Sequence, residues 1–266
     1  MNTLKNIAIT LLALISFSGV YAQSDQDAIA QKLQNPLSNI TALPIQHNFG
    51  LGTPQYEGAT YTTSFQPVMA FEYGNFSMVH RAVIGTTHLP STTLGNGSTF
   101  GTTDLNYSFY FAPKKKLGNL AFGVGPSIDM PTASDDLLGS GKWSAGASLV
   151  AVYQKNKWTL DMVFRQTNSF AGDDQRADVN RFVSQTLIAY SLGKGWVVNT
   201  YPTITANWNA DSGQQWTVPV GGGVSKLVFL GKLPTQFGVQ YYNNVVRPDY
   251  LGKSELRFTT TFVFSK

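Results

Sequence analysis

The chain has 266 residues, no cysteine and a formal net charge of +4 at pH 7, and only 13% of its residues are charged. The lack of cysteine excludes disulfide frameworks, thiol catalysis and cysteine-ligated zinc. Nineteen basic against 15 acidic residues is too thin an excess for nucleic-acid binding, and soluble proteins carry about 25% charged residues, so much of this surface faces something other than water.

Residues 1–22 are typical of a secretory signal peptide. Lys5 supplies the positive charge, an apolar run extends over 7–17, and the small residues Val20 and Ala22 precede the expected cleavage site. The apolar run is much shorter than the ~20 residues of a membrane-spanning helix, which disfavours an anchor. We expect an exported protein whose mature chain starts at Gln23.

The next segment, residues 23–39, contains the one convincing helical stretch, over 24–35. Ile29, Ala30 and Leu33 share one helix face before Asn35-Pro36 ends it. This segment comes before the first predicted strand, so we expect it on the periplasmic side. The sequence leaves open whether it enters the following domain as a plug or remains a docked or mobile tail.

From Thr41 onward, apolar and polar residues alternate with a period of two, which indicates β-strands with one apolar face. Trp158 and Leu160, for example, alternate with Thr159 and Asp161. The turn signals divide this region into twelve predicted strands, at 40–51, 57–71, 74–87, 99–112, 117–130, 142–154, 157–170, 180–192, 195–208, 214–230, 233–245 and 255–265.

These strands are long enough to cross an outer membrane, which takes about 9–11 tilted residues. Their polar faces carry Asp and Arg in mid-strand, and a small packed core could not readily bury such charges. We therefore predict an all-β fold: an antiparallel transmembrane β-barrel of about 12 strands over residues 40–266. A closed barrel satisfies both faces and leaves no sheet edge. The expected partners are outer-membrane lipid and, during biogenesis, the barrel-assembly machinery; nucleic acid is not expected.

The connections give an independent check on this prediction. Every second one is short, and the others are mostly longer and often acidic, which is the asymmetry of periplasmic turns and extracellular loops. The tight connection at 209–213 is the weakest member of this alternation.

The candidate lumen residues are charged side chains on the polar strand faces. They could line a constriction or substrate path, or they could pair with one another and close the lumen. The second reading is favoured, because twelve strands lie between the ~8 that side chains fill and the ~16 that leave an open channel. The set is Asp104, Asp129, Asp161, Arg165, Glu255 and Arg257, with Arg81 less certain.

Two predicted extracellular loops carry a second group of candidate residues, which are Trp143 and the charged Asp135, Asp136, Lys142, Asp173, Asp174, Arg176 and Asp178. Asp173, Asp174 and Asp178 could offer oxygen ligands to Ca²⁺, but their spacing fits no EF-hand loop. Pairing between the loops through Lys142 and Arg176 is the simpler interpretation. We expect no metal and no other cofactor.

A catalytic function finds little support in the sequence. The only histidines are His47, His80 and His88, and their spacing offers no metal pair. An outer-membrane lipid hydrolase would need a serine and an oriented histidine together on the outer wall, for which His80 is the candidate. We expect that the protein is not an enzyme.

Several segments together resemble one family. They are Leu33–Leu37, Gly123–Ser127 followed by Met130–Trp143, Ser169–Asn180 and Gln215–Val220. In this order, within residues 30–264, they resemble the bacterial outer-membrane family labelled for the meta-cleavage pathway of phenol degradation, whose members often carry the automatic label neuromedin U. The chain's last residues, Phe264-Ser265-Lys266, depart from the terminal aromatic common among outer-membrane proteins.

The resemblance implies a relationship to barrels of the fatty-acid-transporter type, which pass hydrophobic compounds. The expected function is a channel for passive uptake or efflux of small hydrophobic compounds, aromatic ones among them. The alternatives are a structural or adhesive barrel with a closed lumen and partner-binding loops, and, third, an outer-membrane lipid hydrolase.

Overall fold

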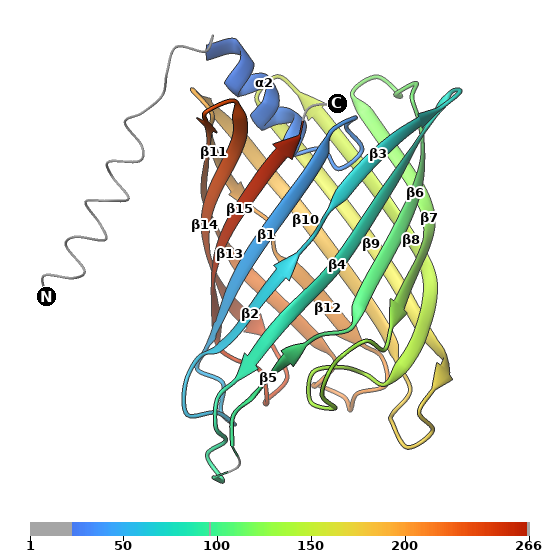
Figure 1. Ribbon diagram of the computed structural model, residues 1–266, viewed down its shortest axis with the longest axis vertical. Coiled ribbons are helices and arrows are strands. Elements are labelled where there is room, and N and C mark those ends of the chain that lie inside the picture. Colours follow the sequence, from blue (N-terminus) through green and yellow to red (C-terminus); the bar gives the residue numbers. More distant parts are fainter. Residues whose placement is uncertain (1–22, 96, 265–266) are drawn as a thin grey trace, which may run out of the picture.

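A computed structural model describes residues 23–95 and 97–264. The expected signal peptide, residues 1–22, lies outside the described residues. The described chain forms one closed antiparallel barrel preceded by a single short helix (Figure 1). The predicted fold class is confirmed. Within the described residues, no helix is long and apolar enough to span a membrane.

The barrel wall consists of twelve crossings, three of which are split into two strands. Its elements are β1 (Thr41–Leu51), β2 (Thr60–Phe65), β3 (Val68–Tyr73), β4 (Phe76–Leu89), β5 (Thr99–Thr102), β6 (Leu105–Pro113), β7 (Leu120–Met130), β8 (Lys142–Lys155), β9 (Trp158–Gly172), β10 (Asn180–Gly193), β11 (Trp196–Thr200), β12 (Thr203–Asn207), β13 (Trp216–Leu230), β14 (Leu233–Val246) and β15 (Ser254–Phe264). The barrel closes where β1 pairs with β15, from Thr41↔Phe264 to Leu51↔Ser254.

Two of the three splits coincide with a proline. Pro67 lies between β2 and β3, and Pro202 lies between β11 and β12. Proline has no backbone N–H to donate to a neighbouring strand, so pairing stops at these points. The predicted continuous strands at 57–71 and 195–208 are therefore each two shorter strands with an interruption in the wall.

The two ends of the barrel differ in their connections. Short turns, such as those at Gly74 and Gly231, where the backbone φ is positive, lie at the same end as the helix. We call this the helix end. The longer connections lie at the opposite, loop end (Figure 1). The doubtful connection at 209–213 does join two strands, so the predicted count of twelve crossings is confirmed.

Large apolar side chains project outward over the whole wall. Phe71, Val124 and Tyr241, for example, are each about half exposed. Aromatic pairs stand on this outer face near both ends, Trp158 with Tyr190 and Trp208 with Trp216. An apolar band flanked by aromatic girdles around a polar interior is the architecture of a bacterial outer-membrane protein, and it places this chain in the outer membrane.

The helix α2 (Gln23–Leu33) lies across the helix end of the barrel (Figure 1). Its predicted apolar face is confirmed, because Ala30 is 1% exposed and packs with Ile29 and Leu33 against the inner wall. The helix ends at Leu33 because the amides of Gln34 and Asn35 bond carbonyls three residues back, and Pro36 cannot donate a further bond.

Candidate functional site

The N-terminal segment (residues 23–39) enters the barrel at the helix end. The apolar face of α2 packs on Ala189, Val197 and Leu227. On the opposite side of the mouth, Leu37 packs into a second cluster made by inward-facing side chains of the wall. That cluster contains Ala70, Val79, Tyr110, Ala112, Ala121, Val150, Val152 and Val163. The segment therefore spans the lumen from one wall to the other.

Hydrogen bonds to two turns hold this segment in place. Asp27 Oδ1 accepts a bond from the backbone N–H of Gly195, at 2.6 Å. Gln154 binds twice: its Nε2 donates to the Gln31 carbonyl at 2.9 Å, and its Oε1 accepts from Asn35 Nδ2 at 3.1 Å. Gly195 and Gln154 belong to two neighbouring hairpins, β10–β11 and β8–β9, so these bonds tether the segment along one side of the mouth.

Residues 33–38, which we call the partition, separate two cavities. The inner cavity, of about 190 Å³, is lined by Leu33 and Gln34 together with side chains from strands all around the lumen. The outer hollow at the mouth is lined by Leu37 and Ser38. Of the residues of the N-terminal segment, Asn35 alone borders both. The partition thus divides the lumen from the space at the mouth.

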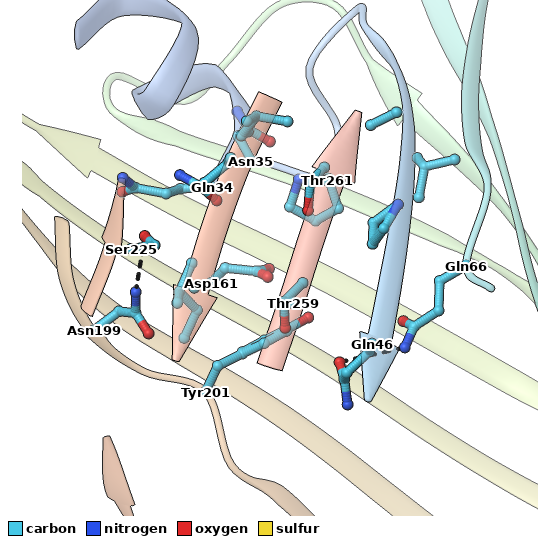
Figure 2. A pocket seen from close by; sticks show the side chains of 18 of the residues that line it. Gln34, Asn35, Gln46, Gln66, Asp161, Asn199, Tyr201, Ser225, Thr259 and Thr261 are labelled. Atoms are coloured by element: carbon cyan, nitrogen blue, oxygen red, sulfur yellow. Dashed lines mark hydrogen bonds between the residues drawn. The ribbon is translucent and has the colours of Figure 1, made fainter. Parts of the chain in front are cut away.

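The inner cavity has polar groups on several sides. In Figure 2, Gln34 and Asn35 reach it from the end of α2, while Asp161, Asn199 and Tyr201 lie on the wall below them. Apolar side chains from neighbouring strands, among them Val150, Val163, Leu187 and Val197, complete the lining.

Two ion pairs lie in the lumen beyond this cavity. Arg165 Nη1 donates to Asp129 Oδ1 at 2.8 Å, and the same carboxylate accepts from Asn106 and Thr167. The second pair joins Arg257 to Glu255, also at 2.8 Å. The structure therefore brings four of the six predicted lumen residues into pairs.

Arg257 also organises two tyrosines that the sequence did not single out. Its Nη1 donates to the Tyr201 carbonyl at 2.7 Å, and its guanidinium lies 4.8 Å from the centre of the Tyr242 ring. The Tyr242 hydroxyl in turn accepts the Tyr201 backbone N–H at 2.8 Å. The Tyr201-Pro202 interruption of the wall thus has its free backbone groups satisfied by side chains from inside the lumen.

Asp161 and Arg81 both face the inner cavity without pairing. Asp161 is 2% exposed, and its Oδ1 is buried with no hydrogen-bond partner. Arg81 Nη2 donates to Gln66 Oε1 at 2.8 Å. Among the described residues, no ion pair joins Arg81 and Asp161, although both line this cavity.

Asp104 differs from the other predicted lumen residues. Its carboxylate accepts bonds from the Ala133 amide and from the amide and hydroxyl of Ser140, at 2.7–3.1 Å. The strand is interrupted between β5 and β6 at this point. The Asp104 side chain therefore anchors the 131–141 loop at the loop end and does not face the inner cavity.

The predicted loop charges are joined across the two loops. Lys142 Nζ lies 3.3 Å from Asp178 Oδ1, and Arg176 Nη1 lies 3.4 Å from Asp136 Oδ1. Arg176 also donates to the Gly139 carbonyl. Bonds from the Ser169 hydroxyl and Lys142 hold the pKa of the Asp178 carboxyl below its usual value.

The remaining loop residues serve local structure or face outward. Asp135 and Asp173 each accept an amide bond from two residues further along the chain, as in Asx turns. Asp174 is exposed, and Trp143 is an exposed outward residue at the start of β8. Over residues 23–95 and 97–264, no group of three or more potential ligands is placed to hold a metal ion, so the calcium alternative gains no support.

The histidines lie on the outer wall among aromatic residues. His80 Nδ1 bonds the Tyr107 hydroxyl at 2.5 Å, and its ring contacts Phe71 and Phe109. Its partners across the strands are Met69 and Phe109. No serine is among these contacts, so the geometry does not favour the hydrolase alternative.

Comparison with known proteins supports the fold. The crystal structure of an outer membrane channel from Pseudomonas putida F1 is similar with a TM-score of 0.62 and 14% sequence identity, covering 85% of this chain and 96% of that one. A NanC porin structure is similar with a TM-score of 0.50 and 12% identity, covering 84% and 100%. No family model matches the sequence, and no curated protein matches it. The chain is thus an outer-membrane β-barrel with the fold of known channels.

Proposed function

We propose that this protein is a passive outer-membrane channel whose periplasmic mouth is closed by the N-terminal segment. The partition carries the proposal, because a stretch of chain outside the wall, and not wall side chains, separates the lumen cavity from the mouth. A segment held by apolar packing and a few hydrogen bonds can leave without unfolding the wall. The similarity to a solved outer membrane channel and a porin supports this reading.

We further propose that the compounds that pass are small and largely apolar, with aromatic molecules among them. Valines and alanines dominate the inner wall around Leu37. The sequence motifs at Leu33–Leu37, Gly123–Ser127 followed by Met130–Trp143, Ser169–Asn180 and Gln215–Val220 resemble the family labelled for phenol degradation. The proposed transport is not coupled to an energy source, so these compounds move down their concentration gradient.

Planar-bilayer conductance tests the gate. We expect little conductance from the mature protein and a clear increase when residues 23–38 are deleted, since β1 begins only at Thr41 and the wall stays complete. The control is Ala28→Asp, which adds a carboxylate on an exposed position of α2. A deletion variant that folds and still conducts nothing would contradict the channel.

Liposome uptake tests the substrate class. Vesicles that contain the deletion variant should take up a phenol or an alkane-like probe faster than empty vesicles, with a charged probe of similar size as the comparison. Equal uptake rates with and without protein, across a panel of apolar probes, would reject this substrate class.

The loop end favours a second candidate function, a structural or adhesive barrel. Asp104, Arg176 and Lys142 tie the 131–141 and 173–179 loops into one ordered surface, which could present itself to an extracellular partner. In that case the lumen stays sealed by its ion pairs, and deletion of residues 23–38 produces no conductance.

A further inference from the structure

The lumen holds two matched ion pairs, and one acid and one base that line the inner cavity stay outside them. Arg165 contacts Asp129 and Arg257 contacts Glu255, each at 2.8 Å. Asp161 on β9 and Arg81 on β4 remain, and both line the same inner cavity. Charged side chains inside proteins are ordinarily paired with an opposite charge, so this leftover pair calls for an explanation.

Of the two groups, Asp161 has the greater need of a hydrogen-bond donor. Its side chain is almost fully buried, and its Oδ1 has no hydrogen-bond partner. A buried carboxylate oxygen without a donor is costly. Arg81 lines the same cavity without contacting Asp161, so a donor placed in the cavity would complete the site.

Arg81 likewise has unused donors toward the cavity. Among the described residues its one hydrogen bond goes from Nη2 to Gln66 Oε1. A guanidinium has five N–H donors and can bind a carboxylate through two of them at once. An acid and a base that face one cavity from different strands, without touching, set up a field suited to a molecule with two opposite poles.

The partition contributes a third unsatisfied group. Gln34 is buried, and neither its Nε2 nor its Oε1 has a partner. Together with Asp161 it borders the cavity shown in Figure 2. Val150, Val163 and Leu187 supply an apolar wall. At about 190 Å³ the cavity exceeds the ~150 Å³ that accommodates benzene, so a solute of amino-acid size fits.

We propose that this cavity binds a small zwitterionic solute, with the cationic end at Asp161, the anionic end at Arg81 and an apolar body against the valines. Gln34, on the partition, bonds one of the two charged ends of the solute. The N-terminal segment in its closed position therefore forms part of the binding site. The inference rests on the proposed function only in that the solute arrives through the lumen; its binding is measured with the segment in place.

Isothermal titration calorimetry of the mature protein in detergent micelles tests the proposal with four matched probes. Valine carries both poles, 3-methylbutanoate only the negative one, 2-methylpropylamine only the positive one, and 2-methylpropan-1-ol neither. We expect valine to bind, and each probe that lacks a pole to bind about tenfold more weakly or worse, as for the loss of one charge-assisted hydrogen bond.

Two variants assign the poles. Asp161→Asn should weaken the binding of valine and leave the affinity for 3-methylbutanoate nearly unchanged. Arg81→Gln should weaken the binding of valine and leave the affinity for 2-methylpropylamine nearly unchanged. Asp174→Asn and Arg176→Gln make the same chemical changes on the loops and should bind valine like the parent protein. Circular dichroism verifies that each variant keeps its β-structure.

Three results would overturn the proposal. The first is that no probe gives heat at millimolar concentration, which leaves water as the cavity's occupant. The second is that valine and 2-methylpropan-1-ol bind equally well. The third is that both variants bind valine with unchanged affinity. None of them bears on conductance after deletion of residues 23–38, so the channel can stand while this site fails. Valine binding in a barrel that never conducts would likewise separate the two.

Discussion

The lumen contains two kinds of contact at two levels. At the helix end, Ala30, Leu33 and Leu37 pack against valines and alanines of the wall. Toward the loop end, arginines and carboxylates on the strands themselves meet in the Arg165–Asp129 and Arg257–Glu255 pairs. The first contact is made by the N-terminal segment, and the second lies within the barrel wall.

This difference separates gating from stability. Apolar packing of the segment is undirected and can be given up as a unit, so changes there should alter whether the lumen is open. Directed bonds of these residues link separate parts of the wall, from Arg165 on β9 to Asp129 on β7 and from Arg257 on β15 to the Tyr201 carbonyl. Changes there should therefore alter how firmly the wall holds together. The variants below test this division, from the largest expected effect to the smallest.

The strongest test places charges in the apolar contact. In the double variant Leu33→Asp with Leu37→Asp, two unpaired carboxylates would have to be buried at a cost of roughly 2 kcal/mol or more each, which shifts the closed-to-open ratio about a thousandfold or more. We expect conductance close to that of the deletion variant, with the wall's stability unchanged. Conductance equal to that of Ala28→Asp would show that the packing does not close the lumen.

A change in the ion-pair region should do the reverse. Asp129→Ala removes the partner of Arg165 and the acceptor of Asn106 and Thr167. The free energy of unfolding, measured by urea titration in vesicles, should fall by about 1–3 kcal/mol, because buried donors are left unpaired. Conductance should stay low while the N-terminal segment is present. Asp174→Ala, at an exposed loop position, is the matched control.

A conservative change at the second pair should have a smaller effect. Arg257→Lys keeps the charge but loses the fork that bonds both Glu255 and the Tyr201 carbonyl. We expect a stability loss of about 1 kcal/mol in the same titration. A loss as large as that of Asp129→Ala would mean that the Tyr201-Pro202 interruption depends on this arginine more than its single carbonyl bond indicates.

The smallest effect is expected at the loop surface, outside both sets of contacts. Because Asp178 is stabilised in its charged form by Ser169 and Lys142, the loop contact is complete above the ordinary carboxyl pKa and is lost as the pH falls through the lowered pKa. The protection factors of the amides in residues 173–179, which correct for the intrinsic pH dependence of hydrogen exchange, should therefore fall in acid. Asp178→Asn should remove this pH dependence without changing the unfolding midpoint of the barrel.

The alternation of side chains by itself determined most of the fold. A period of two predicts that Thr159, Asp161, Val163 and Arg165 share the inner face of one strand, and β9 places them there. The same reasoning found the apolar face of α2 from the helical spacing of Ile29, Ala30 and Leu33. It also found the turns, because glycine and short polar connections interrupt the pattern.

Only the tertiary structure decided which charges meet. A shift of two residues between neighbouring strands keeps every side chain on its face but changes its height in the barrel, and alternation cannot distinguish the two. Register therefore joined Arg165 to Asp129, 36 residues earlier, turned Asp104 to a loop, and left Asp161 without a partner. The sequence likewise did not determine the path of residues 33–38 across the lumen. This path depends on long-range packing against strands that follow the segment in the chain.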